Sequence, residues 1–407
     1  MNHKYTIAII GGGIIGSSIA YFLARTGQAG SIVVIEPDPT YTRATTPNGA
    51  GGVRQLFSQP ENVWMSQYSL QFYKEFAQEM AVGDKPANID FNQRGYLFVV
   101  GEEGAKQLEI NHATQSVQGV NAHLLDYPAL ATRFPSLGLD DIVLGCHSPD
   151  DGTLDTTLAL RGFRDKAESL GVIYLYARVT ALECQQNKVI SATLDSDETV
   201  TADVFVNAAG PWAQEVTAMV GQPLPVVPIC RVKHFWTCPD EDGQPAKIEP
   251  LPLVKDESGV FFRPLISDSL GTGYTGGRPS WEIKPGFNFA PENASMQDYF
   301  ADYFTRVVQP LLTTRLPAFQ AAQCQQSWAG HYAQNTLDGN MILGPVGDIA
   351  NFYVACGFSG HGIMHTPAIG LALSELILTG QYQTMDLSRM SYQRVIDDDP
   401  YPEQGII

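Results

Sequence analysis

Residues 6–36 read TIAIIGGGIIGSSIAYFLARTGQAGSIVVIE, and this stretch decides the fold. Its first apolar run, 6–10, predicts a buried strand, and glycines with the spacing G-x-G-x-x-G follow directly. Apolar residues then recur at helical spacing over 15–23, and a second apolar run, 32–35, ends at an acidic residue. A strand, a tight turn, a helix, a strand and an acid in this order predict a dinucleotide-binding unit.

The three glycines and the acidic residue of that unit each have a physical role. Gly11 permits the turn, Gly13 lets the backbone approach a pyrophosphate, and Gly16 lets the helix pack closely on the strand. The free N–H groups at the helix N-terminus suit the phosphates. Glu36 can accept hydrogen bonds from ribose hydroxyls, and its charge would repel a 2′-phosphate.

Composition narrows the class of protein. The chain has 407 residues, 44% of them hydrophobic and 17% charged, which is typical of a globular protein with two or three domains. The net charge of -18 argues against nucleic acid as a partner, since phosphates require clustered lysine and arginine. The charge argues equally against an anionic membrane surface.

Cysteine usage and hydropathy indicate the compartment. The six cysteines are scattered without a C-x-x-C pair, so we expect reduced thiols, no metal site and a cytoplasmic location. The apolar N-terminus lacks a cleavage-site pattern, and its glycines match a cofactor turn rather than a signal peptide. No other run is long and apolar enough to predict a membrane span.

The rest of the chain alternates helical and strand-like patterns without internal repeats. Thr366 can cap, and Pro367 can begin, a long apolar helix that ends before Gly380. Residues 397–407, DDDPYPEQGII, predict a surface tail. Helices are expected over 63–80, 157–170, 296–312 and 367–378, and strands over 94–100, 171–183, 188–195, 203–206, 227–237 and 259–265.

Features typical of nucleotide binding lie near both chain ends and in the middle, which a cofactor domain interrupted by insertions explains. The expected fold class is therefore α/β, with a Rossmann-like cofactor domain and an inserted α+β substrate domain built on an antiparallel sheet. We expect the discontinuous cofactor domain to hold residues 1–85, 146–220 and 326–407. The substrate domain would hold 86–145 and 221–325.

Three segments match more than a generic Rossmann unit: the opening fingerprint, VFVNAAGPWA at 204–213, and ACGFSGHGIMHTPAIGLALSELIL at 355–378. Together they resemble the D-amino-acid oxidase superfamily of FAD enzymes, in the branch of sarcosine oxidase, glycine oxidase and dimethylglycine dehydrogenase. The resemblance implies a bound FAD, held noncovalently because neither Cys324 nor the NGAGG segment matches a covalent flavin ligand. It also implies that a neutral amine loses a hydride from its α-carbon to flavin N5, and that the imine then hydrolyses.

The segment 357–363, GFSGHGI, resembles the one that reaches the flavin ring in that branch. A glycine-rich turn leading into a helix offers backbone N–H groups and a dipole end to the anionic edge of a reduced flavin. His361 is either a catalytic residue or a packed histidine bonded to a nearby carbonyl. The expected cofactor-binding residues are Gly11, Gly13, Ile14, Ile15, Gly16, Glu36, Gly51, Gly52, Val53, Val179, Ala208, Ala209, Gly210, Trp212, Gly330, Gly357, Phe358, Ser359, Gly360, His361, Gly362 and Ile363.

The same resemblance implies which residues face the reacting atoms. Arg54 matches an arginine that the family places over the flavin; the alternative is a salt bridge on a surface helix. His331 and Tyr332 stand where relatives carry a carboxylate-binding arginine or a flavin-bonding cysteine, so we expect them to line the substrate pocket. Tyr274 lies on the expected pocket floor and completes the predicted catalytic set.

The sequence departs from the family at the substrate carboxylate. Met364 stands where sarcosine oxidases carry a substrate-binding lysine, and Phe57 stands where they carry a second arginine. The usual carboxylate clamp is therefore absent. Arg263 and Arg278 are the leading candidates to replace it, because guanidinium is a bidentate donor.

A second departure concerns oxygen. Those oxidases use a lysine to activate oxygen, and the segment GTGYTGG around Tyr274 offers none. We therefore expect a dehydrogenase rather than an oxidase. Folding could still bring Lys233, Lys255 or Lys284 to that place.

The leading prediction is an FAD-dependent oxidoreductase acting on the C–N bond of an amino acid or a secondary amine. Its partners would be that small molecule and an electron acceptor of unknown identity. A likeness to mitochondrial FAD-dependent oxidoreductase domain-containing proteins linked to respiratory complex assembly, extending to QTMDLS, leaves open an assembly or interaction role with structural FAD. A nicotinamide-dependent dehydrogenase is disfavoured, because 204–213 and 357–363 have no place in a simple NAD domain.

Overall fold

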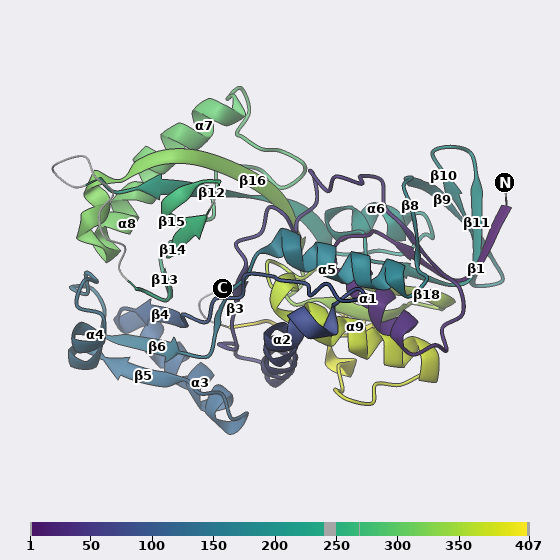
Figure 1. The fold of residues 1–407 in the computed structure, drawn as a ribbon, viewed down its shortest axis with the longest axis horizontal. Helices are drawn as coiled ribbons and strands as arrows, with labels where there is room; N and C mark the ends of the chain where they lie inside the picture. Colours follow the sequence, from purple (N-terminus) through teal and green to yellow (C-terminus); the bar gives the residue numbers. More distant parts are fainter. Residues whose placement is uncertain (1, 240–249, 268, 405–407) are drawn as a thin grey trace.

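The structure, a computed structural model, describes residues 2–239, 250–267 and 269–404. Within these residues the strands form two eight-stranded sheets and one two-stranded sheet. Figure 1 shows the large sheets in separate halves of the molecule, the first on the right and the second on the left. The chain crosses between the halves several times, as insertions into a cofactor domain require.

The first sheet has the order β17-β18-β11-β1-β2-β8, and β9 and β10 extend it beside β11. Its centre is parallel, since β1 pairs in parallel with both β2 and β11. The apolar run at residues 7–10 is buried within β1, as its composition predicts. The strands are β1 (Asn2–Ile10), β2 (Ile32–Ile35), β8 (Ile173–Leu175), β9 (Val179–Gln185), β10 (Lys188–Leu194), β11 (Thr199–Asn207), β17 (Ile342–Val346) and β18 (Ile349–Cys356).

A layer of long helices packs beside this sheet, namely α1 (Ile14–Arg25), α2 (Pro60–Glu79), α5 (Thr156–Ser169) and α9 (Gly362–Thr379). Helix α1 contacts both α5 and α9, and α9 also contacts α2. Phe72, Phe76 and Phe163 interlock between α2 and α5, with ring centroids 5.3–6.1 Å apart. These contacts confirm the helices predicted over 63–80 and 157–170.

The prediction that the last long helix begins at Pro367 is wrong. Helix α9 begins five residues earlier, at Gly362, and Pro367 lies inside it. Proline has no N–H to give to the carbonyl of Ile363, which would leave a buried acceptor unpaired. The hydroxyl of Tyr73 on α2 donates to that carbonyl at 2.7 Å, so the helix continues through the proline.

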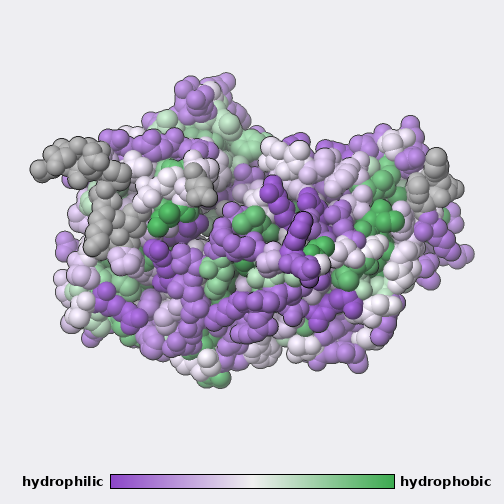
Figure 2. Space-filling view, viewed as in Figure 1, coloured by the Kyte–Doolittle hydropathy of each residue, from purple (hydrophilic) through white to green (hydrophobic). Residues whose placement is uncertain are grey.

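Helix α9 is also long and apolar enough, by length and composition, to cross a membrane. It packs against α1 and α2, and just over half of its span is buried. Its composition therefore matches a place in the core. The face of the molecule in Figure 2 carries mostly hydrophilic side chains, with apolar residues in scattered patches.

The second sheet has the order β16-β12-β15-β14-β13-β4-β6-β5. It is antiparallel except at β13 and β4, which pair in parallel. Helices α7 (Met296–Tyr303) and α8 (Gln309–Arg315), joined by a π-helical turn, replace the single helix expected over 296–312. The strands are β4 (Tyr96–Val100), β5 (His123–Asp126), β6 (Leu144–Ser148), β12 (Val226–Thr237), β13 (Leu253–Asp256), β14 (Phe261–Ser267), β15 (Gly271–Gly277) and β16 (Gln323–Asn335).

Smaller elements complete the described chain. Strands β3 (Gly52–Val53) and β7 (Gly152–Thr153) pair with each other. The remaining helices are α3 (Glu102–Val117), α4 (Tyr127–Arg133), α6 (Ala213–Ala218) and α10 (Gln393–Ile396). The structure places β6 and β16 in the second sheet, so residues 146–148 and 326–335 pair with the strands of the expected substrate domain.

The end of the described chain lies on the surface, as expected, with residues 397–400 exposed, but it is anchored there rather than loose. Glu403 is only 7% exposed, and its carboxylate accepts a hydrogen bond of 2.7 Å from Asn62 Nδ2 on α2. Asn111 Nδ2 on α3 donates to the carbonyl of Gln404 at 2.9 Å. Polar side chains of two helices therefore fix this segment; residues 405–407 lie outside the described part.

Candidate cofactor and substrate site

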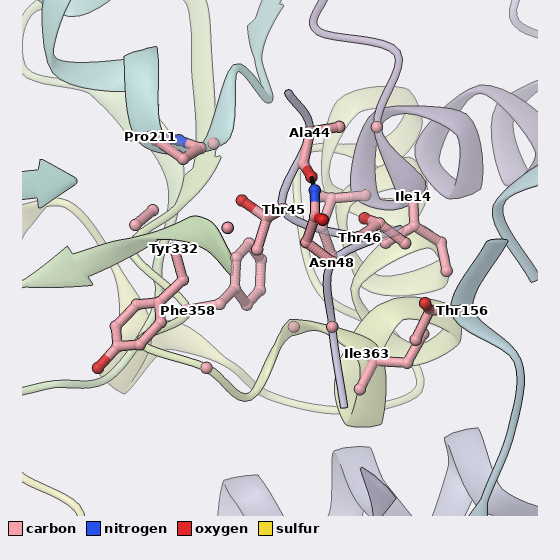
Figure 3. A pocket seen from close by; sticks show the side chains of 18 of the residues that line it. Ile14, Ala44, Thr45, Thr46, Asn48, Thr156, Pro211, Tyr332, Phe358 and Ile363 are labelled. Atoms are coloured by element: carbon pink, nitrogen blue, oxygen red, sulfur yellow. Dashed lines mark hydrogen bonds between the residues drawn. The ribbon is translucent and has the colours of Figure 1, made fainter. Parts of the chain in front are cut away.

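A cavity of about 620 Å3 runs between the two sheets. One wall comes from the turn after β1, the start of α1 and the segment before α9; the other comes from β12, β13 and β16. Figure 3 shows Ile14, Thr45, Pro211, Tyr332 and Ile363 around the space, contributed by both halves of the molecule.

The glycine turn has the geometry that the fingerprint predicts. Gly11 has φ +101°, and a Cβ there would lie 2.5 Å from the Ala208 carbonyl oxygen. A Cβ on Gly16 would lie 1.9 Å from the Gly11 carbonyl oxygen, so only glycine allows this helix–strand approach. A Cβ on Gly13 would meet no protein atom within 4 Å, because Gly13 faces the cavity. The vacant space over Gly13 fits a pyrophosphate.

Two helix N-termini point at the cavity. Gly13 is the N-cap residue of α1 and His361 that of α9, and neither helix has a side-chain cap or an acidic residue in its first turn. Their first residues line the cavity, so their N–H groups and dipole ends offer positive potential to an anion. This arrangement suits the diphosphate at α1 and the anionic edge of a reduced flavin at α9.

Glu36 lines the cavity beside the glycine turn. It follows β2 directly, is buried, and accepts hydrogen bonds from Gly12 N at 2.8 Å and from Asp38 N at 3.0 Å. Burial raises its pKa, which those two bonds oppose. Each oxygen keeps a lone pair for a ribose hydroxyl. The residues present therefore fit FAD.

Arg54 is buried at 4% exposure, in the segment after β3, and not on a surface helix. It donates to the Leu56 carbonyl at 3.0 Å and contacts His361 Nε2 at 3.3 Å. Since a guanidinium only donates, Nε2 is the acceptor and the proton of this ring lies on Nδ1. Burial, together with the charge of Arg54, lowers the pKa of His361 well below its usual value, so the ring is neutral.

Two of the predicted catalytic residues, His331 and Tyr332, are neighbours on β16, so their side chains point to opposite faces of the sheet. Tyr332 lines the cavity, and its hydroxyl accepts a hydrogen bond from Arg231 of β12, whose guanidinium lies 4.4 Å from the Tyr332 ring centroid. His331, one position earlier, points to the opposite face, where its Nε2 contacts the Asn288 carbonyl at 2.9 Å. Its ring packs on Phe289, with centroids 4.4 Å apart. His331 therefore does not line the cavity.

Tyr274 also points away from the cavity. It pairs with Trp236 across β12 and β15 and stacks on it, and it packs edge-on against Phe319 at 4.8 Å between centroids. These residues form the core between the second sheet and helices α7 and α8. Of the four predicted catalytic residues, Arg54 and Tyr332 reach the cavity, and His331 and Tyr274 do not.

The cavity does hold lysines, although none stands beside Tyr274. Lys233 of β12 and Lys255 of β13 both line it, whereas Lys284 is exposed and pairs with Glu292 at 2.8 Å. Of the two arginines expected to bind a carboxylate, Arg278 lines the cavity and Arg263 does not. Met364 lines the cavity, and the buried Phe57 packs against the Arg54 guanidinium, 4.3 Å from its ring centroid.

Nearly all expected cofactor residues line the cavity; the exceptions are Gly16, Val53 and Gly357, which pack behind it. Sequence reasoning missed the loop after Glu36, where Asn48 Nδ2 donates to the Ala44 carbonyl at 2.9 Å (Figure 3). The polar, glycine-rich stretch TRATTPNGAGG was the available signal. The missed lining residues include Arg43, Thr45, Thr46, Asn48, Tyr96 and Arg231.

The family model described as FAD dependent oxidoreductase, DAO, matches residues 6–376. The chain is 34% identical to FAD-dependent oxidoreductase domain-containing protein 1 of Xenopus laevis, over 98% of this chain and 84% of that protein. It is 26% identical to mitochondrial dimethylglycine dehydrogenase of Rattus norvegicus, over 92% of this chain but 43% of that protein.

Solved structures share the fold. L-proline dehydrogenase from P. horikoshii matches with a TM-score of 0.80 at 25% identity, over 98% of this chain and 100% of that one. Glycine oxidase from Geobacillus kaustophilus matches with a TM-score of 0.77 at 21% identity, over 96% and 99%. These matches confirm the α/β fold class, and the family model confirms FAD as the cofactor. The protein is therefore a member of the DAO family of FAD-dependent oxidoreductases.

Proposed function

We propose that this protein oxidises the C–N bond of an amino acid or an N-alkyl amine. FAD, when bound, supplies the hydride acceptor at its N5. The observation that carries the proposal is the position of cations on the cavity wall opposite the cofactor cradle, where Arg231, Lys233 and Lys255 form no ion pair within the described residues. Dimethylglycine dehydrogenase and sarcosine dehydrogenase, both named for amine substrates, are 24–26% identical to this chain, which supports the same class.

The residues of this chain prepare the substrate rather than abstract a proton. Cations on the wall, Arg231 and Lys255 among them, disfavour an ammonium group beside them and so lower the pKa of a bound amine. The neutral amine is the form that can release a hydride. Arg54 and the N-terminus of α9 provide positive potential where negative charge develops. His361 is neutral and holds the guanidinium of Arg54 in place.

We further propose a dehydrogenase, and the relatives named as dehydrogenases support this choice. The sequence argument for a dehydrogenase was that no lysine near Tyr274 could activate oxygen. The structure does not support that argument, because Lys233 and Lys255 line the cavity. Stopped-flow mixing of the reduced protein with air-saturated buffer tests it. Reoxidation much slower than turnover with a quinone or dye acceptor is expected; reoxidation as fast as dye turnover would make the protein an oxidase.

The proposal as a whole is tested by supplying secondary and N-methyl amino acids together with a dye acceptor. We expect dye reduction that is matched in amount by the aldehyde or oxo acid formed when the imine hydrolyses. Protein that keeps its FAD but reduces no dye with any of these amines would contradict the proposal and favour an assembly role.

A further inference from the structure

The second sheet presents an uncompensated positive charge to the cavity. Arg231 and Lys233 alternate on β12 and so share one face, and Lys255 lines the cavity from β13. Within the described residues none of these three forms an ion pair with a carboxylate. The acidic residues that line the cavity all lie in the half of the molecule that holds the first sheet; they are Glu36, Asp38 and Glu215.

Of these three cations, Lys233 has the fewest contacts that would balance its charge. It is 5% exposed, and its Nζ has no hydrogen-bond partner within the described residues. Its Nζ lies over the Trp328 ring, 5.0 Å from the ring centroid. A buried ammonium without a counter-ion is unfavourable, because nothing offsets the loss of its hydration. A bound anion would remove that penalty.

Lys255 and Arg231 stand some distance apart on the same wall of the cavity. The strand order puts β12 and β13 three positions apart in the sheet, roughly 14 Å between backbones. Their long side chains still approach closely enough that Arg231, after burial and Arg54, lowers the pKa of Lys255, to about 7. The Tyr332 hydroxyl meanwhile fixes Arg231. The cations therefore repel one another along a wall where, within the described residues, no carboxylate forms an ion pair with them.

The cavity wall carries more positive charge than a substrate with one carboxylate would neutralise. The negative charge of a reduced flavin is met by Arg54 and the N-terminus of α9. A single α-carboxylate would pair with one more cation, such as Lys255 beside Arg54. Arg231 and Lys233 would then remain unpaired.

We infer that the substrate is an amine with two carboxylates, of the amino dicarboxylate class, whose second carboxylate binds at Arg231, Lys233 and Tyr332. The inference rests on the proposed function, because it assigns the amine of that reaction. The carboxylate next to the reacting carbon lies at Lys255 and Arg54. The second subsite selects against substrates with a single carboxylate.

Ligand binding to the FAD-loaded protein, followed through the visible absorbance of the flavin, tests the inference without turnover. Thiodiacetate carries two carboxylates, (methylthio)acetate carries one, and neither has a C–N bond to oxidise. We expect thiodiacetate to bind at least 10-fold more tightly. Equal dissociation constants would overturn the inference.

Single variants locate the second subsite. Lys233→Met and Arg231→Met should each remove most of the preference for thiodiacetate while changing the dissociation constant of (methylthio)acetate less than threefold. Lys106→Met removes an exposed lysine that pairs with Glu109 and serves as the matched control, so it should keep the full preference. A preference that survives both cavity variants would contradict the assignment.

The two proposals fail separately. If thiodiacetate binds with the expected preference but no amine reduces the flavin, the dicarboxylate subsite stands and the proposed oxidation is wrong. If monocarboxylic amines reduce the flavin and thiodiacetate shows no preference, the oxidation stands and the dicarboxylate assignment is wrong.

Discussion

The Arg54 guanidinium lies 3.3 Å from Nε2 of His361 and joins the segment after β3 to the first turn of α9. Both side chains are buried and line the cavity. The bond fixes the tautomer of His361 and keeps its ring neutral, so positive charge at this point comes from Arg54, the neighbouring Lys255 and the helix end rather than from the imidazole.

Arg54→Met should slow the anaerobic bleaching of the flavin by a saturating amine about 100-fold, because one preorganised cation is lost where charge develops. FAD content should stay near that of the native protein, since the glycine turn and Glu36 are untouched. Stopped-flow absorbance in the flavin band measures the rate. A rate within twofold of native would show that Arg54 does not act on the reaction.

Gly13→Val should abolish FAD binding while the apoprotein stays folded, because the added carbons project into the cavity over the pyrophosphate place and meet no protein atom. Gly16→Val is the contrast: its side chain would collide with the Gly11 carbonyl, so it should destabilise the fold itself. Flavin content and far-ultraviolet circular dichroism separate the two. A Gly13→Val protein with full flavin content would refute the assignment of the turn.

Tyr73→Phe should lower the free energy of unfolding by about 1–3 kcal/mol, since it leaves the buried Ile363 carbonyl without a donor. Urea denaturation of the apoprotein measures the change. Tyr176→Phe removes a hydroxyl from a side chain that is 48% exposed and should change stability by less than about 0.5 kcal/mol. Equal effects of both substitutions would mean that the Tyr73 bond does not support α9.

Dicarboxylate affinity should fall as the pH rises through neutrality. Burial, reinforced by Arg263, lowers the pKa of Lys233 to about 7, and burial with Arg54 and Arg231 lowers the pKa of Lys255 to about 7. Below this value both lysines are cations and attract the anion; above it the free protein holds them neutral and must take up protons to bind.

The dissociation constant of thiodiacetate should therefore rise between pH 7 and 9, by up to about 10-fold per unit for each lysine. Lys233→Met should reduce this slope. A constant affinity over that range would contradict the role of the two lysines. The reference is (methylthio)acetate, whose affinity should change with pH through the titration of Lys255 and not of Lys233.

The opening unit could be predicted because its determinants are local. The turn at Gly11, the packing at Gly16 and the position of Glu36 after β2 all follow from neighbours in the sequence. The start of α9 could not be predicted, because Pro367 is tolerated only through Tyr73, which lies on another helix. Helix α3 was not predicted for a related reason. Its buried positions include the polar Asn111 and Gln115, which form hydrogen bonds with segments distant in the sequence.

Strand parity explains the errors at the site. The sequence places polar residues at 331 and 332, but only the pairing of Arg231 with Gly330 decides that Tyr332 faces the cavity and His331 the opposite side of the strand. The same parity turns Tyr274 toward Trp236. Lys233 and Lys255 enter the cavity through strand order, which no local pattern reports.

The most direct measurement is anaerobic titration of the FAD-loaded protein with an amine of the proposed class, iminodiacetate, while the flavin absorbance is followed. We predict loss of the oxidised flavin band at one equivalent of amine oxidised per flavin, with glyoxylate and glycine formed in the same amount. A flavin band that persists with iminodiacetate and with every N-methyl and secondary amino acid tried, in protein that retains its FAD, would contradict the assignment of this protein as an amine oxidoreductase.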